Sequence, residues 1–484
     1  SRQPGADGKV EAVQAHHAWA HDFILDDLIL LNLPRHSEHH MHPRRSYHLL
    51  RWAGQAPQYP YNYAVMTLLI LVPPLFRRVV HPLLDGGVAT LPVRRNDLGY
   101  QIGLIGFTRM SSQLRQLHCL IDVHPRYALR LVLVIATSLC GLPLRLWETV
   151  RFGRQISQVR IDQPPVFIIG HWRSGTTHMH NLMSQDPAFG YLSMYQAMVP
   201  NCSLVGRRWL KPLLARIVPA KRPMDNMVWP MDAPQEEEIP LAKIMPYSFY
   251  SRFLFPRRSR ELFATYVLLE GAPPRVVKEL KRTYYRLLQV ATLHAGGKRL
   301  ILKNPVNTAR VALLLELFPD AKFIHVYRCP YDVFASTVNL YSELLMMTTL
   351  QALRIEDAGD TILAVYEAMM RRFFRERSLI PQDNLVDVRF EDLERDPLGE
   401  LARIYDTLAL PGFGAAEPAF RSYVRSQQTY SKNRLILSPE DRARVEQHWA
   451  FAFAELGYPR LGEPEGDGQA VPTRREPRVK SLSA

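Results

Sequence analysis

The sequence predicts an α/β fold with a central, mostly parallel sheet and helices on both faces. Three observations lead to this prediction. Four short apolar runs typical of buried strands lie between about residues 160 and 400, each run is followed by a stretch with helical periodicity, and polar residues stand where the runs end. Strands that alternate with helices pair in parallel, and ligands bind at the carboxyl ends of such strands.

The four strand and helix units follow one another along the chain. The first is VFIIG, which runs through a glycine-containing turn into the helical stretch THMHNLMSQD. The second is KRLILKNP at 298–305 with the amphipathic TARVALLLELFPD, and the third, at 321–341, turns at Pro330 into a helix. The fourth, at 384–397, is a strand that leads into an acidic helical start.

Composition divides the chain into regions. The N-terminal region is rich in His, Arg and Pro, and its histidines lack the spacing and the acidic or Cys partners of a metal site, so no site is assigned to them. The segment after the first unit is Pro-rich, then helical, which suits a substrate lid. The predicted regions are a disordered or mobile tail at 1–60, an apolar helical region at 61–155, the α/β domain at 160–460 with a lid insertion at about 190–297, and a disordered tail at 461–484.

Two apolar stretches, at 64–76 and 131–144, fall in the apolar helical region. Both are shorter than the roughly 18 residues that a membrane span needs, and both are interrupted by proline. Flanking arginines suit a segment that lies on an anionic membrane surface, and a pair of buried core helices is the alternative. Because no secretory signal pattern is present, we expect a cytoplasmic protein, with peripheral membrane association under the first interpretation.

The charge balance favours anionic partners. The 484 residues contain 60 Lys plus Arg against 46 Asp plus Glu, which gives a formal net charge of +14. Nucleic acid, anionic lipid head groups and phosphorylated or sulfated small molecules all fit this charge. Four widely separated cysteines give no sign of a disulfide framework.

The segment GHWRSGTTH follows the first predicted strand and forms a P-loop-like turn. Gly170 and Gly175 let the backbone turn so that its amide groups converge on an anion, and Thr176 and Thr177 open a helix whose N-terminus adds positive potential. The lysine that nucleotide triphosphatases place after the second glycine is absent, and Arg173 lies inside the loop instead. The loop predicts an anion site, although similar turns also occur by chance.

A second anion site is predicted after the third strand. Arg328 ends that strand, and Ser336 lies eight residues later in the following helix, so both side chains could face one phosphate. Two separate phosphate sites imply a ligand with phosphate at both ends. A structural ion pair between Arg328 and Asp332 is the alternative.

Together these motifs resemble the sulfotransferases that use 3'-phosphoadenosine 5'-phosphosulfate (PAPS), in particular a bacterial branch with the loop GHWRSGTTH. The resemblance covers residues from about 163 to 460. The family's 5'-phosphosulfate loop has Lys or Arg followed by Ser, Gly, Thr and Thr, and its 3'-phosphate motif has an Arg and a Ser eight residues later. The matching positions are Arg173, Ser174, Gly175, Thr176 and Thr177 in the first motif and Arg328 and Ser336 in the second.

The resemblance implies further positions around the donor nucleotide. His178 stands where the family often has a Trp that stacks on adenine. Phe390 replaces the Tyr of a Tyr-Glu-Asp sequence near the adenine, so a hydroxyl is missing there. Lys432 and Arg434 in YSKNRL correspond to a basic segment that closes over the 3'-phosphate.

The resemblance also implies catalytic residues. Arg173 would hold the phosphosulfate, and Lys303 at a strand end resembles the family lysine that stabilises charge on the leaving phosphate. Since no His follows this lysine, the base is sought in the run QEEE at 235–238, where Glu236 is preferred and Glu238 comes second. An acidic helix start without catalytic role is the alternative for this run.

Two histidines are further candidates for the base. His171 lies inside the loop and His325 lies in the middle of a predicted strand, so packing or loop structure explains each of them more simply.

The predicted function is therefore sulfuryl transfer from PAPS, without a metal ion, to the hydroxyl or amine of a small, hydrophobic acceptor. Nucleic acid is not a predicted partner. The first alternative, a P-loop kinase or other nucleotide phosphotransferase, would need the missing lysine and magnesium. A nucleotide- or lipid-binding membrane protein without catalytic activity is the third interpretation, which the basic charge and the apolar stretches favour.

Overall fold

The computed structural model describes residues 107–109, 123, 128–218, 230–351, 356–427 and 437–460. The predicted tails at 1–60 and 461–484 and the first apolar stretch lie outside the described residues, as do Lys432 and Arg434. The predictions made for them are therefore not addressed by the structure.

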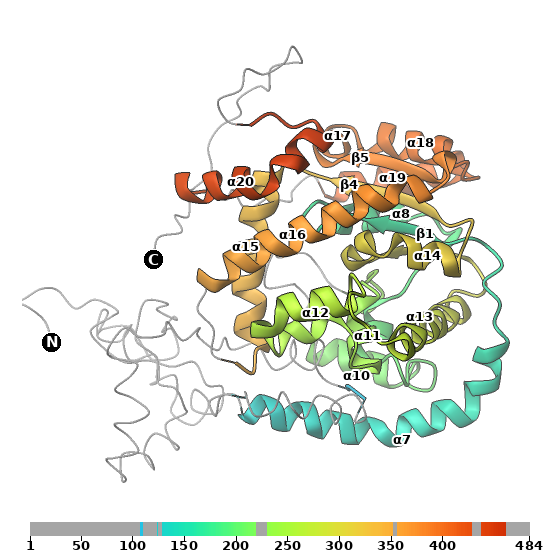
Figure 1. The fold of residues 1–484 in the computed structure, drawn as a ribbon. Helices are drawn as coiled ribbons and strands as arrows, with labels where there is room; N and C mark the ends of the chain where they lie inside the picture. The colour runs from blue at the N-terminus through green and yellow to red at the C-terminus, as the bar shows by residue number, and fades with distance from the viewer. Residues whose placement is uncertain are drawn as a thin grey trace, which may run out of the picture.

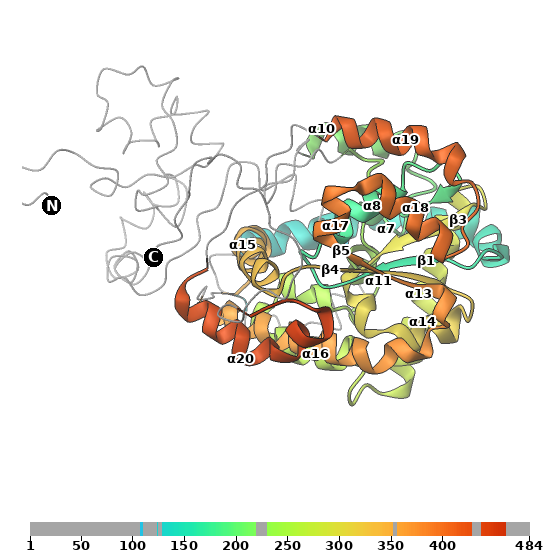
Figure 2. The same cartoon turned by 90° about the horizontal axis from the view of Figure 1, so that it is seen from above.

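The core of the molecule is a sheet of five parallel strands in the order β2-β3-β1-β4-β5. Figure 2 labels β3, β1, β4 and β5 of this sheet. Val166 of β1 lies opposite Ile301 of β3 on one side and Lys322 of β4 on the other. The central position of β1 places the loop that follows it between the ends of its two neighbours. The strands are β1 (Val166–Ile169), β2 (Phe189–Gly190), β3 (Arg299–Lys303), β4 (Lys322–Tyr327) and β5 (Leu385–Arg389).

The strand side chains alternate between two separate hydrophobic cores, one on each face of the sheet. Phe167 and Ile169 belong to the larger core, whereas Val166 and Ile168 belong to the smaller one. All four side chains are buried because helices cover both faces, and such strands are therefore continuous apolar runs in the sequence. Figure 1 shows α17 and α18 above the strands and α13 and α14 below them.

The helices fall into groups by the strands that they follow. After β1 comes α8 (Thr176–Met183), and after β4 come α15 (Pro330–Thr348) and α16 (Glu356–Glu376). Between β2 and β3 lie α9 (Met194–Met198), α10 (Leu210–Ile217), α11 (Glu238–Ile244), the 3-10 helices η5 (Phe249–Phe253) and η6 (Pro256–Arg258), α12 (Ser259–Tyr266) and α13 (Pro274–His294). The others are η7 (Pro305–Ala309) and α14 (Val311–Leu317) after β3, η8 (Arg377–Leu379) and η9 (Gln382–Asn384) before β5, and α17 (Phe390–Arg395), α18 (Pro397–Thr407), α19 (Phe413–Ser426) and α20 (Pro439–Leu456) after it.

The four predicted strand and helix units are all present, and the predicted α/β class with a parallel sheet and helices on both faces is confirmed. One strand was not predicted: β2 has only two residues, too few for a periodic signal. The segment at about 190–297 is largely helical. Its role as a substrate lid stays a prediction.

A long helix, α7 (Ala128–Gln158), precedes the sheet and runs along the lower edge of the molecule in Figure 1. It contains the second apolar stretch and continues through Pro143. Its inner face packs through Val134 and Ile156, and buried Glu148 accepts hydrogen bonds from the backbone N–H groups of Leu204 (2.8 Å) and Val205 (3.2 Å). None of the described helices is long and apolar enough to cross a membrane.

Candidate active site

The loop after β1 needs its first glycine. Gly170 has a φ of 135°, and a Cβ atom there would lie 2.1 Å from the carbonyl oxygen of Val326 in β4. The backbone N–H of Gly170 donates to Oγ1 of Thr308 over 2.7 Å, which ties the loop to η7. Arg173 also adopts a left-handed conformation, with a φ of 70°, which is unusual for a residue other than glycine. The loop is therefore held in a strained, sharply turned shape.

The second glycine of the loop lies under an aromatic ring. A Cβ atom on Gly175, whose φ is 98°, would lie 2.1 Å from the ring of Phe390 at the start of α17. The His178 ring lies edge-on to Phe390 at 6.4 Å between centroids, and the Arg328 guanidinium lies 5.0 Å from the Phe390 centroid. The structure thus brings together residues predicted around the donor nucleotide from the ends of β1, β4 and β5.

The two predicted anion motifs meet through a direct hydrogen bond. Nε of Arg173 donates to Oγ of Ser336 in α15 over 2.7 Å. Arg328 instead pairs with Asp332 at 2.8 Å, as the structural alternative predicted. Ser336 therefore contacts the loop arginine rather than its own motif partner. The remaining loop residues Ser174, Thr176 and Thr177 lie at the turn into α8, and the first two are buried.

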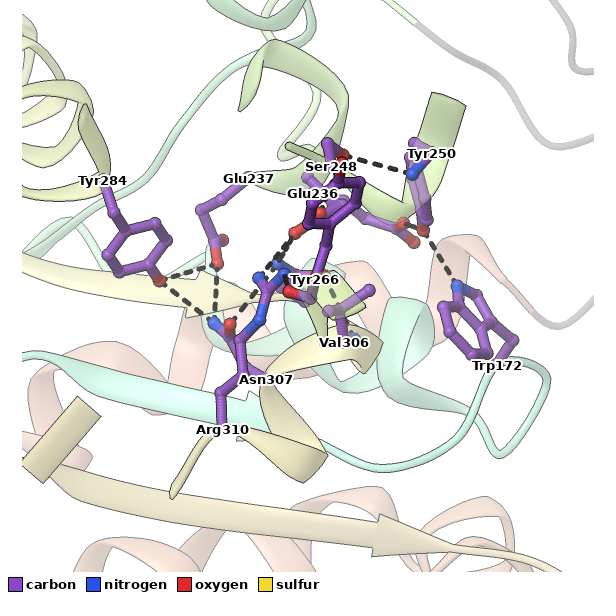
Figure 3. Close-up of polar contacts among 12 residues, drawn as sticks. Trp172, Glu236, Glu237, Ser248, Tyr250, Tyr266, Tyr284, Val306, Asn307 and Arg310 are labelled. Carbon is purple, nitrogen blue, oxygen red and sulfur yellow. Dashed lines mark hydrogen bonds and ion pairs between the residues drawn. The ribbon is translucent and has the colours of Figure 1, made fainter. Parts of the chain in front are cut away.

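Lys303 and Glu236 form an ion pair at the end of β3. The Nζ of Lys303, whose side chain is 2% exposed, contacts Oε1 of Glu236, whose side chain is 16% exposed. The Tyr250 hydroxyl donates to Oε2 of Glu236 and accepts a 2.8 Å hydrogen bond from the Trp172 indole (Figure 3). Glu236 thus links the strand end, through Tyr250, to the loop after β1.

Glu237 reaches the backbone of the same lysine. Its Oε1 accepts a hydrogen bond from the Lys303 backbone N–H over 2.9 Å. Its Oε2 lies 3.2 Å from Nδ2 of Asn307 and 3.3 Å from the Tyr284 hydroxyl, as Figure 3 shows. Complete burial raises the pKa of Glu237 to about 8, despite these donors. Sequence reasoning assigned no role to Glu237, because only tertiary burial separates it from its neighbours.

Glu238, the second candidate base, is the first residue of α11 and is buried. Its Oε2 pairs with Nη1 of Arg310 at 2.9 Å and accepts from Nδ2 of Asn304 at 3.1 Å. Its Oε1 accepts from the Ser248 hydroxyl at 2.7 Å. Since each oxygen already has a donor, Glu238 joins α11, η5 and η7 together. Both oxygens of Glu236 also have donors, from Lys303 and Tyr250, but its side chain is 16% exposed whereas that of Glu238 is 1% exposed.

The two candidate histidines have local partners. Burial lowers the pKa of His171 to about 3, and its Nδ1 lies 2.8 Å from the Trp172 carbonyl oxygen. His325 is buried in β4 with Nδ1 2.7 Å from Asp387 of β5. Each therefore contributes to local structure. Among the described residues, no three His, Cys, Asp or Glu side chains are grouped so that they could hold a metal ion.

Comparison with known proteins identifies the family. Residues 164–414, more than half of the chain, match the model of the sulfotransferase family. The chain belongs to this family. The menaquinone sulfotransferase Stf3 of Mycobacterium tuberculosis, named for ω-hydroxy-β-dihydromenaquinone-9, is 35% identical over 68% of this chain and 84% of its own length. This sulfotransferase is therefore an enzyme, and the phosphotransferase and non-catalytic interpretations are not supported.

A solved structure agrees with this membership. The sulfotransferase STF9 from Mycobacterium avium superimposes with a TM-score of 0.55, at 22% identity, over 71% of this sulfotransferase and 88% of that chain. At this identity the match shows a shared fold.

A further match concerns a short stretch only. Alkane 1-monooxygenase 1 of Pseudomonas aeruginosa is 42% identical over 81 residues, which are 17% of this chain and 21% of that enzyme. Because the match covers only about a fifth of the monooxygenase, it does not indicate monooxygenase activity in this chain.

Proposed function

We propose that this sulfotransferase uses PAPS as the donor of its sulfuryl group. One observation supports the proposal most strongly: Arg173 of the loop and Ser336 of α15, from the two predicted anion motifs, are 2.7 Å apart. A donor with a phosphosulfate at one end and a 3'-phosphate at the other fits two anion motifs at one site. The loop from Arg173 to Thr177 would hold the phosphosulfate, and Arg328 and Ser336 would hold the 3'-phosphate.

The adenine would lie near His178 and Phe390. Their rings lie edge-on at 6.4 Å between centroids, and the Phe390 ring lies against Gly175 of the loop. Aromatic rings beside a phosphate loop fit a purine ligand, whose flat face packs on such side chains. The proposal extends to Lys432 and Arg434, which follow from the family motif and lie outside the described residues.

The chemistry of transfer rests on Glu236 and Lys303. Glu236 accepts the proton of the acceptor hydroxyl while the acceptor oxygen forms its bond to sulfur. The bond between sulfur and the bridging oxygen of the donor breaks, and Lys303 stabilises the charge that this oxygen gains. The ion pair between Lys303 and Glu236 keeps the two side chains together before the substrates bind. Bound PAPS would supply an activated sulfuryl group, because the phosphate is a good leaving group.

The acceptor in this proposal is a small, hydrophobic molecule with a hydroxyl or amine. Stf3, the relative that matches over most of the chain, is named for a hydroxylated menaquinone. In this chain, Met194 and Met198 of α9 and Phe249 of η5 are buried, and both elements contact α11, which begins at Glu238. The apolar side chains are consistent with a hydrophobic acceptor site, and they also contribute to the core.

We also propose a cytoplasmic enzyme that binds the surface of an anionic membrane through α7 and α10. The outer faces of the two helices expose large apolar side chains, with exposed arginines nearby. Within the described stretches 128–158 and 201–218 the only carboxylate is that of Glu148, which is buried. Apolar rows with tryptophan and arginine suit a lipid interface. The exposed apolar residues are Val132, Ile135, Leu139, Leu142, Leu146, Trp147 and Val150 of α7, and Trp209, Leu213 and Ile217 at α10.

Calorimetric titration with 3',5'-ADP, the product of PAPS, tests the proposed donor. We expect the protein to prefer 3',5'-ADP over 5'-ADP, and Arg328→Ala to abolish this preference because it removes a 3'-phosphate contact. Equal binding of the two nucleotides would contradict PAPS as the donor. Labelled PAPS and a panel of hydrophobic alcohols and amines would then identify the acceptor.

A further inference from the structure

Arg252 is a buried cation for which the described residues supply no carboxylate or carbonyl hydrogen-bond partner. It belongs to η5, two residues after Tyr250, and is 1% exposed. Within the described part of the chain, its Nε and Nη2 atoms are buried and have no hydrogen-bond partner. The guanidinium carbon lies close to four aromatic ring centroids, namely those of Trp172 (5.3 Å), Phe249 (4.4 Å), Phe253 (4.8 Å) and Tyr341 (4.3 Å).

Aromatic rings alone do not satisfy such a side chain. Ring faces attract a cation, but the N–H groups at the edge of a guanidinium need oxygen acceptors in its plane. Leaving them unpaired in the interior costs free energy. Arg310, the comparable buried arginine, pairs with Glu238 at 2.9 Å and donates to the Tyr266 carbonyl at 2.6 Å. Within the part of the chain that the structure describes, Arg252 has no oxygen ligands comparable to those of Arg310.

The position of Arg252 connects it with the proposed transfer site. Trp172, one of its four rings, donates to the Tyr250 hydroxyl, which in turn donates to Glu236. Burial lowers the pKa of Arg252 to about 10, while the charges of Tyr250 and Glu236 act to raise it, so the side chain stays cationic at neutral pH. A positive charge with free N–H groups therefore lies next to the proposed base.

We propose that Arg252 binds oxygens of the sulfuryl group during transfer. A sulfuryl group presents several oxygens that share negative charge, and the planar fork of a guanidinium matches a pair of such oxygens. Lys303 would act on the bridging oxygen, whereas Arg252 would act on the transferred group itself. This inference rests on the proposed sulfuryl transfer from PAPS.

The test compares PAPS with 3',5'-ADP, which differ by the sulfuryl group. Calorimetry would give both affinities for the wild type, Arg252→Met and Arg252→Lys. We expect Arg252→Met to weaken PAPS binding about tenfold or more while 3',5'-ADP binding stays unchanged, with Arg252→Lys intermediate. An equal effect on both ligands, or no effect, would overturn the role of Arg252. An unchanged ratio of PAPS affinity to 3',5'-ADP affinity in Arg252→Met, together with a raised KM for the acceptor, would also overturn it. That result would assign Arg252 to an acceptor oxygen.

The same titrations separate this inference from the proposed donor. A wild-type protein that binds neither PAPS nor 3',5'-ADP would contradict the donor, and with it the inference. A wild-type protein that binds both, with a ratio that Arg252→Met leaves unchanged, would contradict the inference alone.

Thermal unfolding without ligand separates a binding role from a structural one. Met fills a similar volume among aromatic rings and removes an unpaired buried charge, so we expect Arg252→Met to leave Tm unchanged or raise it. Arg310→Met is the matched control, and it should lower Tm because it leaves Glu238 buried without its cation. An equal fall in Tm for both variants would show that Arg252 supports the fold, and would overturn the proposal.

Discussion

Nε of Arg173 donates a 2.7 Å hydrogen bond to Oγ of Ser336, although the two residues are 163 positions apart in the sequence. The bond joins the loop after β1 to the helix after β4. Both strands end at the same edge of the parallel sheet, which is why two distant motifs meet there. A substitution of either residue should therefore also change how the other residue contributes to nucleotide binding.

Substitution of this pair should give coupled losses of affinity for 3',5'-ADP. We expect Arg173→Ala to weaken binding about tenfold or more and Ser336→Ala by a smaller factor, because charged hydrogen bonds contribute more than neutral ones. The double variant should lose less than the product of the two factors. Ser342→Ala, in the same helix with its hydroxyl bonded to Asn339, is the control and should bind normally. Independent, multiplicative losses would contradict a shared site.

Removal of the proposed base should slow turnover without weakening donor binding. We expect Glu236→Gln to lower kcat by about 10²- to 10⁴-fold, the usual contribution of a general base. Affinity for 3',5'-ADP measured by calorimetry should stay unchanged. Glu316→Gln, a carboxylate in an exposed ion pair with Lys281, serves as the control. A normal kcat for Glu236→Gln would show that another group accepts the proton.

The raised pKa of Glu237 predicts a specific dependence of stability on pH. With a pKa of about 8 when folded and about 4.5 when unfolded, Glu237 stays protonated to a higher pH in the native protein than in the unfolded chain. The native state then binds more protons between these values, so the free energy of unfolding should fall as pH rises from about 4.5 to 8. Glu237→Gln cannot titrate and should lose less stability over this range. The measurement is the free energy of unfolding of both proteins at pH 5 and pH 8.5. An equal change between the two pH values for the wild type and Glu237→Gln would contradict the raised pKa.

Two glycines with similar backbone angles should respond differently to alanine. Gly175 has a φ of 98° and lies under Phe390, whereas Gly412 has a φ of 90° and no atom within 4 Å of an added Cβ. Gly412→Ala should cost about 1 to 2 kcal/mol from backbone strain alone. Gly175→Ala adds a clash with the Phe390 ring, so it should lower Tm further and weaken 3',5'-ADP binding. Equal Tm values for the two variants would mean that the ring moves freely.

The outer face of α7 should determine vesicle binding. We expect the protein to sediment with phosphatidylglycerol-containing vesicles, less so at high salt and less with neutral phosphatidylcholine. Leu139→Ser combined with Leu146→Ser should reduce this binding several-fold, because both side chains are more than half exposed. Leu379→Ser, an equally exposed leucine in η8, is the control. Unchanged binding of the double variant would exclude α7 as the contact.

The sequence was most informative where both faces of a strand are buried. The runs that became β1, β3 and β4 are mostly apolar, because their apolar side chains enter the two cores on opposite faces of the sheet. The two-residue β2 carries no such pattern. The sequence also left open whether α7 is a buried helix or has one exposed face. Its inner and outer faces are both apolar, so only the structure shows which side chains are exposed.

The candidate site could be located from sequence but not resolved into roles. The loop and Ser336 could each be placed after a strand end, but the sequence paired Ser336 with Arg328 and did not predict its hydrogen bond to Arg173. The choice between Glu236 and Glu238 depended on partners from η5, η7 and β3, which no local pattern encodes. The same holds for Arg252, which in the sequence is one of many arginines and becomes distinctive only when its surroundings are known.

The three consecutive glutamates have different partners: Glu236 the Lys303 side chain, Glu237 the Lys303 backbone, and Glu238 the Arg310 guanidinium. Composition treats the run as one acidic cluster, but its members are not interchangeable. Deleting one residue would leave two adjacent acids and a nearly unchanged net charge while assigning every partner to the wrong carboxylate. When relatives are aligned, a gap placed within this run would therefore imply a rebuilt site, even where the acidic character is retained.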